Sequence, residues 1–395
     1  MKKILSTVLV GALIAGIAFA EVSFEYKGTA IVGNTTKNLG TNQLDRTDQF
    51  ALGFKNDIAG VEMEFDIEDT GDAKNNKFVL DHFYGYLTFG LPVGSLQITS
   101  GKWDARWVSR IKDDAGDLTS KYYEAYKPGV IEGFGLAKDI DNLTGNKNMS
   151  TVLAYTLEDT LPGKLMFKFG LVGLQNDPLS APNGKEYNEG DADDVRIKSG
   201  FVGQVSYQQD DLFKFNVDFK TLKQNAYAFG LFFSPLMIEN LKATLGFSMG
   251  IYNIGEKVAD ANRADRTEWG VDLRLRYAIN EKVAITTMHN ISGRKLTPNS
   301  ANKAEEVDTM AMWNMISASY KAGDNIRFLA TIQNINKDWK ASNPTANTFA
   351  ITPACEIKAG EKVKVTTAFD IRWTGVAPYA GTGNISLPIY VKFSL

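Results

Sequence analysis

The residues with the clearest chemical potential are charged side chains that recur at every second position along short stretches of the chain. One acidic row consists of Glu62, Glu64, Asp66 and Glu68. Later stretches carry mixed rows, made up of Lys214, Asp272, Arg274, Arg276, Lys362, Lys364, Asp370 and Arg372. Side chains two residues apart share one face of a β-strand, so each row places its charges together. There they could pair with one another, hold water or attract dissolved ions.

The residues between these charges are apolar, which predicts two-faced strands. From 267 to 279 the residues Trp269, Val271, Leu273, Leu275 and Tyr277 alternate with Glu268, Asp272, Arg274 and Arg276. The same alternation recurs at 60–67, 212–220, 362–373 and 385–395. Strands are expected to begin near Val22, Asp48, Gly60, Phe78, Ser95, Ser150, Lys164, Arg196, Leu212, Asn225, Asn240, Arg266, Lys282, Val307, Asp324, Thr348, Lys362 and Asn384. This reading predicts about 18 strands, with about 16 as the alternative.

The links between the expected strands alternate in length. Short links include Asn56–Asp57, Asn280–Glu281 and Ala359–Gly360, whereas long links include 175–195 and 253–264. Short turns on one rim and long loops on the other are typical of up-and-down barrels that span a membrane. A soluble all-β sandwich also alternates, but it rarely extends over so long a chain without a domain break.

The first 20 residues indicate export. Lys2 and Lys3 precede an apolar run, and small residues at Ala18 and Ala20 supply a cleavage site, which predicts a signal peptide over 1–20. We expect 21–395 to form one transmembrane β-barrel in the outer membrane, in contact with its lipid. The single cysteine, Cys355, excludes an intramolecular disulfide, and the net charge of −3 does not favour a nucleic-acid partner.

In a membrane barrel the apolar face must contact lipid, so the charged face must line the interior. At about 16–18 strands the interior is wide enough for a water-filled channel. The sequence therefore predicts passive diffusion of small hydrophilic solutes and ions. The alternative for any single charge is that it pairs along the wall.

The stretch 102–149 is much longer than an ordinary connection. It contains aromatic residues such as Trp107 and Tyr122 among many charges, which is too aromatic for a solvated tail. We expect it to fold inward as a constriction loop; an ordinary surface loop is the alternative. Its candidate charged residues are Lys102, Asp104, Arg106, Asp113, Asp114 and Asp117.

The segment 83–104, FYGYLTFGLPVGSLQITSGKWD, resembles the fourth and fifth strands of general bacterial porins. In that family a strand ending in Gly and a basic residue leads into the constriction loop, and Gly101 and Lys102 take that place here. The family has Arg then Gln where this chain has Lys102 and Trp103. The resemblance implies acids of 113–117 at the constriction, a homotrimer, and recognition of the last strand by the barrel-assembly machinery. That strand keeps its alternation through Phe393 but ends in Leu395 instead of Phe.

Other functions find less support. His82 and His289 are the only histidines, and neither has a serine two residues away as a barrel phospholipase requires, so no enzymatic activity is expected. An acidic run over 189–194 lacks the glycine and closing glutamate of a calcium loop, and no glycine-rich loop fits a nucleotide, so neither a metal nor a cofactor is expected. A substrate-specific sugar or carboxylate channel and a surface adhesin or antigen remain as alternatives.

Overall fold

The computed structural model describes residues 21–32, 44–68, 77–103, 149–172, 200–222, 226–252, 264–298, 307–336, 338–340, 347–360, 363–374, 382–386 and 389–394. The predicted signal peptide, most of the predicted constriction loop and most of the long links lie outside these ranges. At some positions the structure describes the backbone alone.

The described residues form β-strands and turns, without a helix. The first ten strands are β1 (Glu21–Val32), β2 (Leu44–Lys55), β3 (Ala59–Glu68), β4 (Lys77–Gly90), β5 (Ser95–Lys102), β6 (Met149–Leu161), β7 (Gly163–Val172), β8 (Gly200–Gln209), β9 (Phe213–Leu222) and β10 (Ala226–Pro235). The others are β11 (Leu241–Tyr252), β12 (Ala264–Ala278), β13 (Val283–Pro298), β14 (Val307–Lys321), β15 (Ile326–Asn336), β16 (Asn347–Lys358), β17 (Val363–Ala368), β18 (Asp370–Thr374), β19 (Thr382–Ser386) and β20 (Ile389–Ser394).

These strands form one antiparallel up-and-down sheet, as predicted. β1 to β16 pair with one another in sequence order. β17 and β18 both pair with β16 and share the next position, while β19 and β20 pair with them and share the last. The described sheet is thus sixteen strands wide from β1 to β16. The final four short strands lie end to end in pairs and add the width of two more strands. A strand begins within about four residues of each predicted start.

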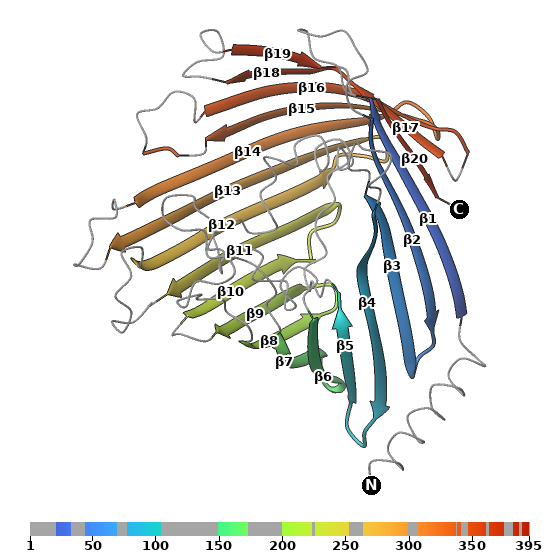
Figure 1. The fold of residues 1–395 in the computed structure, drawn as a ribbon, viewed down its shortest axis with the longest axis vertical. Helices are drawn as coiled ribbons and strands as arrows, with labels where there is room; N and C mark the ends of the chain where they lie inside the picture. Colours follow the sequence, from blue (N-terminus) through green and yellow to red (C-terminus); the bar gives the residue numbers. More distant parts are fainter. Residues whose placement is uncertain are drawn as a thin grey trace.

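The first and last strands meet along a short seam. β20 pairs with β1 over six residue pairs, from Lys27↔Ser394 to Val32↔Ile389. The pairings therefore lead around the sheet and back to β1, which lies beside β17 and β20 in Figure 1. Residues 21–26 of β1 extend beyond this seam, so the described pairings do not close the sheet along the whole of β1.

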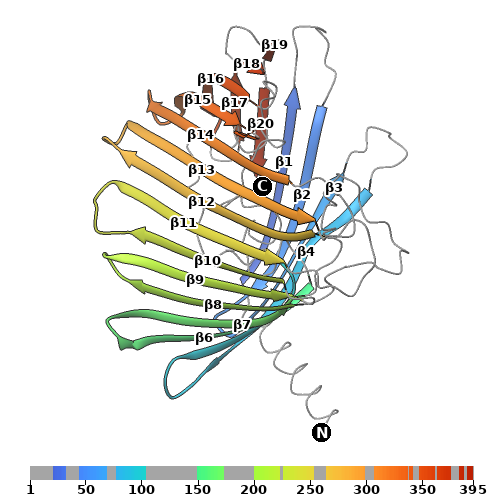
Figure 2. The same cartoon turned by 90° about the vertical axis from the view of Figure 1, so that its left-hand side faces the viewer.

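Asparagine side chains fix two of the short turns. The Asn56 Oδ1 atom accepts hydrogen bonds from the backbone N–H groups of Ile58 and Ala59, at 2.9 and 2.7 Å. Asn280 does the same for Lys282 and Val283, at 2.9 and 2.8 Å. An asparagine that holds the backbone in this way favours a tight reversal. We call the edge that carries these turns the short-turn rim, and Figure 2 shows β7 to β14 side by side between the two rims.

The side chains of the strands alternate between two faces. On β10 the exposed set is Tyr227, Phe229, Leu231 and Phe233, and the buried set is Ala228, Phe232 and Ser234. On the described strands we call the exposed side the outer face and the buried side the inner face. Neighbouring strands keep the same two faces, since directly paired residues of an antiparallel ladder point the same way.

Candidate functional site: the inner face

The inner face is mainly polar and the outer face is mainly apolar. On β8, the side chains of Gln204 and Ser206 are 2% and 3% exposed on the inner face, whereas Phe201 and Val205 are 49% and 41% exposed on the outer face. Soluble proteins have the opposite arrangement and expose their polar groups. A sheet that contacts hydrocarbon needs its apolar side chains outside, because lipid offers no hydrogen-bond partners. The predicted separation of the two faces is confirmed for these strands.

On β12 the inner-face charges pair with one another. Arg274 Nε donates to Asp272 Oδ2 at 2.7 Å, and both side chains are less than a tenth exposed. Farther along the same strand Glu268, also buried, accepts from Arg294 Nε of β13 at 3.1 Å. Arg276 continues this row and is half-buried. The sequence predicted Asp272 and Arg274 on one face of the strand, and in the structure the two side chains form an ion pair on that face.

A second buried cluster lies between β8 and β9, and its neutral members Gln204, Ser206 and Asn216 were not predicted from the sequence. Gln204 Nε2 donates to Asp218 Oδ1 at 2.6 Å, and Ser206 Oγ donates to Asn216 Oδ1 at 2.6 Å. Asn216 Nδ2 in turn donates to Asp218 Oδ2. Most of these side chains are neutral, so a search for charged rows passes over them. Their alternation with apolar outer residues such as Phe219 is the signal that could have found them.

The acidic row on β3 meets a histidine of β4. His82 Nε2 lies 3.0 Å from Glu62 Oε1, and its Nδ1 lies 3.5 Å from Glu64 Oε1. The Tyr84 hydroxyl donates to Glu62 Oε2 at 3.2 Å. A register shift in the pairing of β3 and β4 after Glu64 accompanies this arrangement. His82 thus bridges two acids that the sequence had placed in one row.

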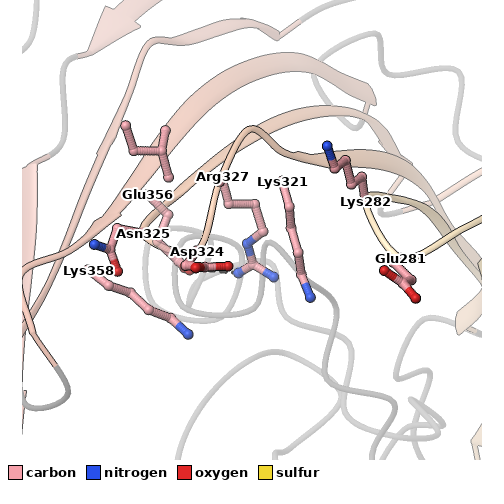
Figure 3. Close-up of a pocket in the computed structure, with 10 residues that line it drawn as sticks. Glu281, Lys282, Lys321, Asp324, Asn325, Arg327, Glu356 and Lys358 are labelled. Carbon is pink, nitrogen blue, oxygen red and sulfur yellow. Dashed lines mark hydrogen bonds and ion pairs between the residues drawn. The ribbon is translucent and has the colours of Figure 1, made fainter.

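A pocket lies on the short-turn rim where β14, β15 and β16 end or begin. Glu356 is one of the acids that line it, with Oε2 at 2.9 Å from Arg327 Nη2 and at 3.2 Å from Lys364 Nζ. The pocket has a volume of about 400 Å³. Its lining, drawn as sticks in Figure 3, consists of Glu281, Lys282, Lys321, Gly323, Asp324, Asn325, Ile326, Arg327, Glu356 and Lys358.

The predicted pore-lining residues do not all fall within the described part. Lys214 on β9 and Lys364 on β17 are half-buried and alternate with outer residues, as expected. The side chains of Asp66, Glu68, Asp370 and Arg372, and the whole of Lys362, lie outside the described residues. So do the loop candidates Asp104, Arg106, Asp113, Asp114 and Asp117.

Lys102 departs from the expectation for the constriction loop. It is the last residue of β5 and pairs directly with the exposed Phe83 of β4, which places it on the outer face. Its Nζ atom donates to the backbone oxygen of Leu80 at 3.1 Å. Gly101 and Trp103, on either side of it, are buried. Successive side chains of a strand point to opposite faces, so the position of Lys102 along β5, and not its charge, decides which face it occupies.

The second histidine lies on the outer face. His289 Nδ1 is 2.8 Å from Asn314 Oδ1, its direct partner across β13 and β14. Within the described ranges no three His, Cys, Asp or Glu side chains are grouped so that they could hold a metal ion. Among these residues there is also no helix with the length and apolarity to cross a membrane.

No protein-family model matches the chain, and no curated protein sequence matches it either. Solved structures do resemble it over nearly its whole length. The anion-selective porin from Comamonas acidovorans has a TM-score of 0.53 at 10% identity, over 95% of this chain and 100% of that one. OccK11 (OpdR) from Pseudomonas aeruginosa has a TM-score of 0.56 at 9% identity, over 96% of both chains. OccAB3 from Acinetobacter baumannii has a TM-score of 0.55 at 10% identity, over 96% of this chain and 100% of that one. At such identities the likeness concerns the fold, and the chain has the fold of the bacterial outer-membrane porins.

Proposed function

We propose that this protein is an outer-membrane porin that lets small hydrophilic solutes and ions diffuse passively through a water-filled interior. The observation that carries the proposal is the inverted distribution of side chains, with large apolar residues exposed and polar residues facing inward. Such a surface is stable against hydrocarbon and costly in water. The porin fold of the solved structures supports the same conclusion.

The inner-face charges divide into two groups with different roles. Asp272 and Arg274 are buried and paired, so they hold the wall together and contribute little net charge to a passage. The Glu62 side chain is 42% exposed, and Lys364 is 25% exposed although it contacts Glu356. We assign solute contact to this accessible group, to which Lys214 and Arg276 also belong. These side chains lie on β3, β9, β12 and β17, so acidic and basic sectors of the wall would face one another and influence ion preference.

Several parts of the proposal concern segments beyond the described residues. We propose that 1–20 is removed on export, that 102–149 narrows the passage, and that the last strand is read by the barrel-assembly machinery. We also propose a homotrimer in the lipid of the outer membrane. We also propose a channel without enzymatic activity.

A substrate-specific channel is the second candidate. The paired charges on several strands favour it, because a fixed pattern of donors and acceptors could select one class of solute. A channel of this kind would show saturable transport, whereas a diffusion porin would pass solutes in proportion to their concentration.

Recording from planar lipid bilayers tests the proposal. The purified full-length protein should insert and give stepwise increases in conductance, and the current should rise with salt concentration. A heat-denatured sample at the same concentration is the control for detergent artefacts. Intact, folded protein that gives no steps at high load would contradict the channel and favour an adhesin or a structural barrel.

A further inference from the structure

The pocket at the short-turn rim brings together cationic side chains from three connected strands. Lys321 is the last residue of β14, Arg327 lies at the start of β15, and Lys358 ends β16. In Figure 3 the side chains of these three residues extend downward from the ribbon, while that of Lys282 extends upward. The volume of about 400 Å³ falls within the range of small-molecule sites.

The strand register places like charges directly opposite one another at this pocket. Lys321 pairs with Arg327 across β14 and β15, and Lys358 pairs with Lys364 across β16 and β17. Like charges in direct cross-strand positions repel and destabilise a sheet. Glu356, the direct partner of Arg327, is the acid between these two pairs. The sheet therefore keeps two repulsive pairs beside a single carboxylate.

That carboxylate is already engaged by two of the four cations. Glu356 Oε2 contacts Arg327 Nη2 at 2.9 Å and Lys364 Nζ at 3.2 Å. The structure gives no ion pair to Lys321 or Lys358 among the described residues. The other acids of the lining, Glu281 and Asp324, are exposed residues of the turns, and Lys321 and Lys358 are exposed at the strand ends. With Lys282, the lining holds four cations against three acids. The positive charges of the pocket wall thus outnumber its negative charges.

We propose that this pocket binds a compact solute with two or more negative charges, of the phosphate or dicarboxylate class. Such an anion would lie between Lys321 and Lys358 and relieve the repulsion in both cross-strand pairs. Arg327 would add fixed donors, since its planar guanidinium matches the oxygen geometry of carboxylates and phosphates. A singly charged ion such as chloride would offset only one of the two lysine charges.

The proposal rests on the proposed channel in one respect, because solutes must reach the inner face of the rim. Its test therefore measures binding separately from conduction. Inorganic phosphate and succinate are titrated into the detergent-solubilised, full-length barrel by isothermal titration calorimetry at neutral pH. The test variant is Lys321→Gln with Lys358→Gln. Lys164→Gln is the matched control, since Lys164 is a half-exposed lysine of β7, 2.5 Å from Glu158, in another sector.

For each anion, the wild-type protein and the Lys164→Gln control should bind with the same affinity. The double variant should lose roughly tenfold in affinity, because each exposed ionic contact contributes a modest amount. Asp324→Asn should bind more tightly, since it removes a negative charge from the edge of the pocket. That opposite sign separates a local site from a general loss of folded protein.

Several outcomes would overturn the inference. They are no binding by folded wild-type protein, equal binding by the double variant, or an equal loss in the Lys164→Gln control. Weaker binding in Asp324→Asn would also count against it. If the anions bind as expected but the protein gives no bilayer conductance, the anion site is supported and the channel is refuted.

Discussion

The buried ion pair on β12 gives a sharp prediction for the substitution Asp272→Asn. Asp272 and Arg274 are joined at 2.7 Å, with side chains 2% and 7% exposed. Removing the carboxylate charge leaves a guanidinium charge in a site that water scarcely reaches. Breaking one partner of a buried pair costs about 3–5 kcal/mol of folding free energy. The outcome therefore reports whether this part of the inner wall is dry.

The assay is urea unfolding of the barrel in lipid vesicles, followed by tryptophan fluorescence and by the shift in gel mobility between folded and unfolded protein. The control is Lys340→Gln, because Lys340 forms a pair with Asp308 at 2.5 Å in which both side chains are about half exposed. Such a pair contributes less than about 1 kcal/mol. If Asp272→Asn cost no more than the control, the reasoning from burial would be refuted.

Three further predictions concern the faces and the loop. Ile316→Arg on the outer face should destabilise the barrel in lipid by about 2–4 kcal/mol, because Ile316 is 52% exposed and would contact hydrocarbon; unchanged unfolding would place that face in water. Glu62→Gln should lower the ratio of cation to anion permeability measured from reversal potentials, and a constant ratio would move Glu62 out of the conduction path. Deleting 105–143 should raise single-channel conductance if this segment narrows the passage, and an unchanged conductance would indicate a surface loop.

The strand pattern could be predicted from the sequence because a period of two is a local property. On β12 the alternation of Asp272 and Arg274 with Leu273 and Leu275 assigned both faces correctly. The starts of β5 and β14 were predicted at Ser95 and Val307, where the structure has them.

The contacts between strands could not be predicted in this way. His82 reaches Glu62 from 20 residues away, and Arg327 reaches Glu356 from 29 residues away. Which residues face one another depends on the register of each pair, and that is set by the turn that joins the strands. Lys102 shows the same limit, since the sequence grouped it with the charges of the constriction loop while the register places it on the outer face.

The central claim is that the inner face lines a water-filled passage, and cysteine accessibility during single-channel recording tests it most directly. In a Cys355→Ala background, Lys214→Cys places a thiol on the inner face and Phe215→Cys places one on the outer face at the next position. A charged, water-soluble thiol reagent should change the conductance of the first variant in steps and leave the second unchanged. Current that persists unaltered in the first variant, with the thiol shown to be free, or a change in the second, would contradict the account.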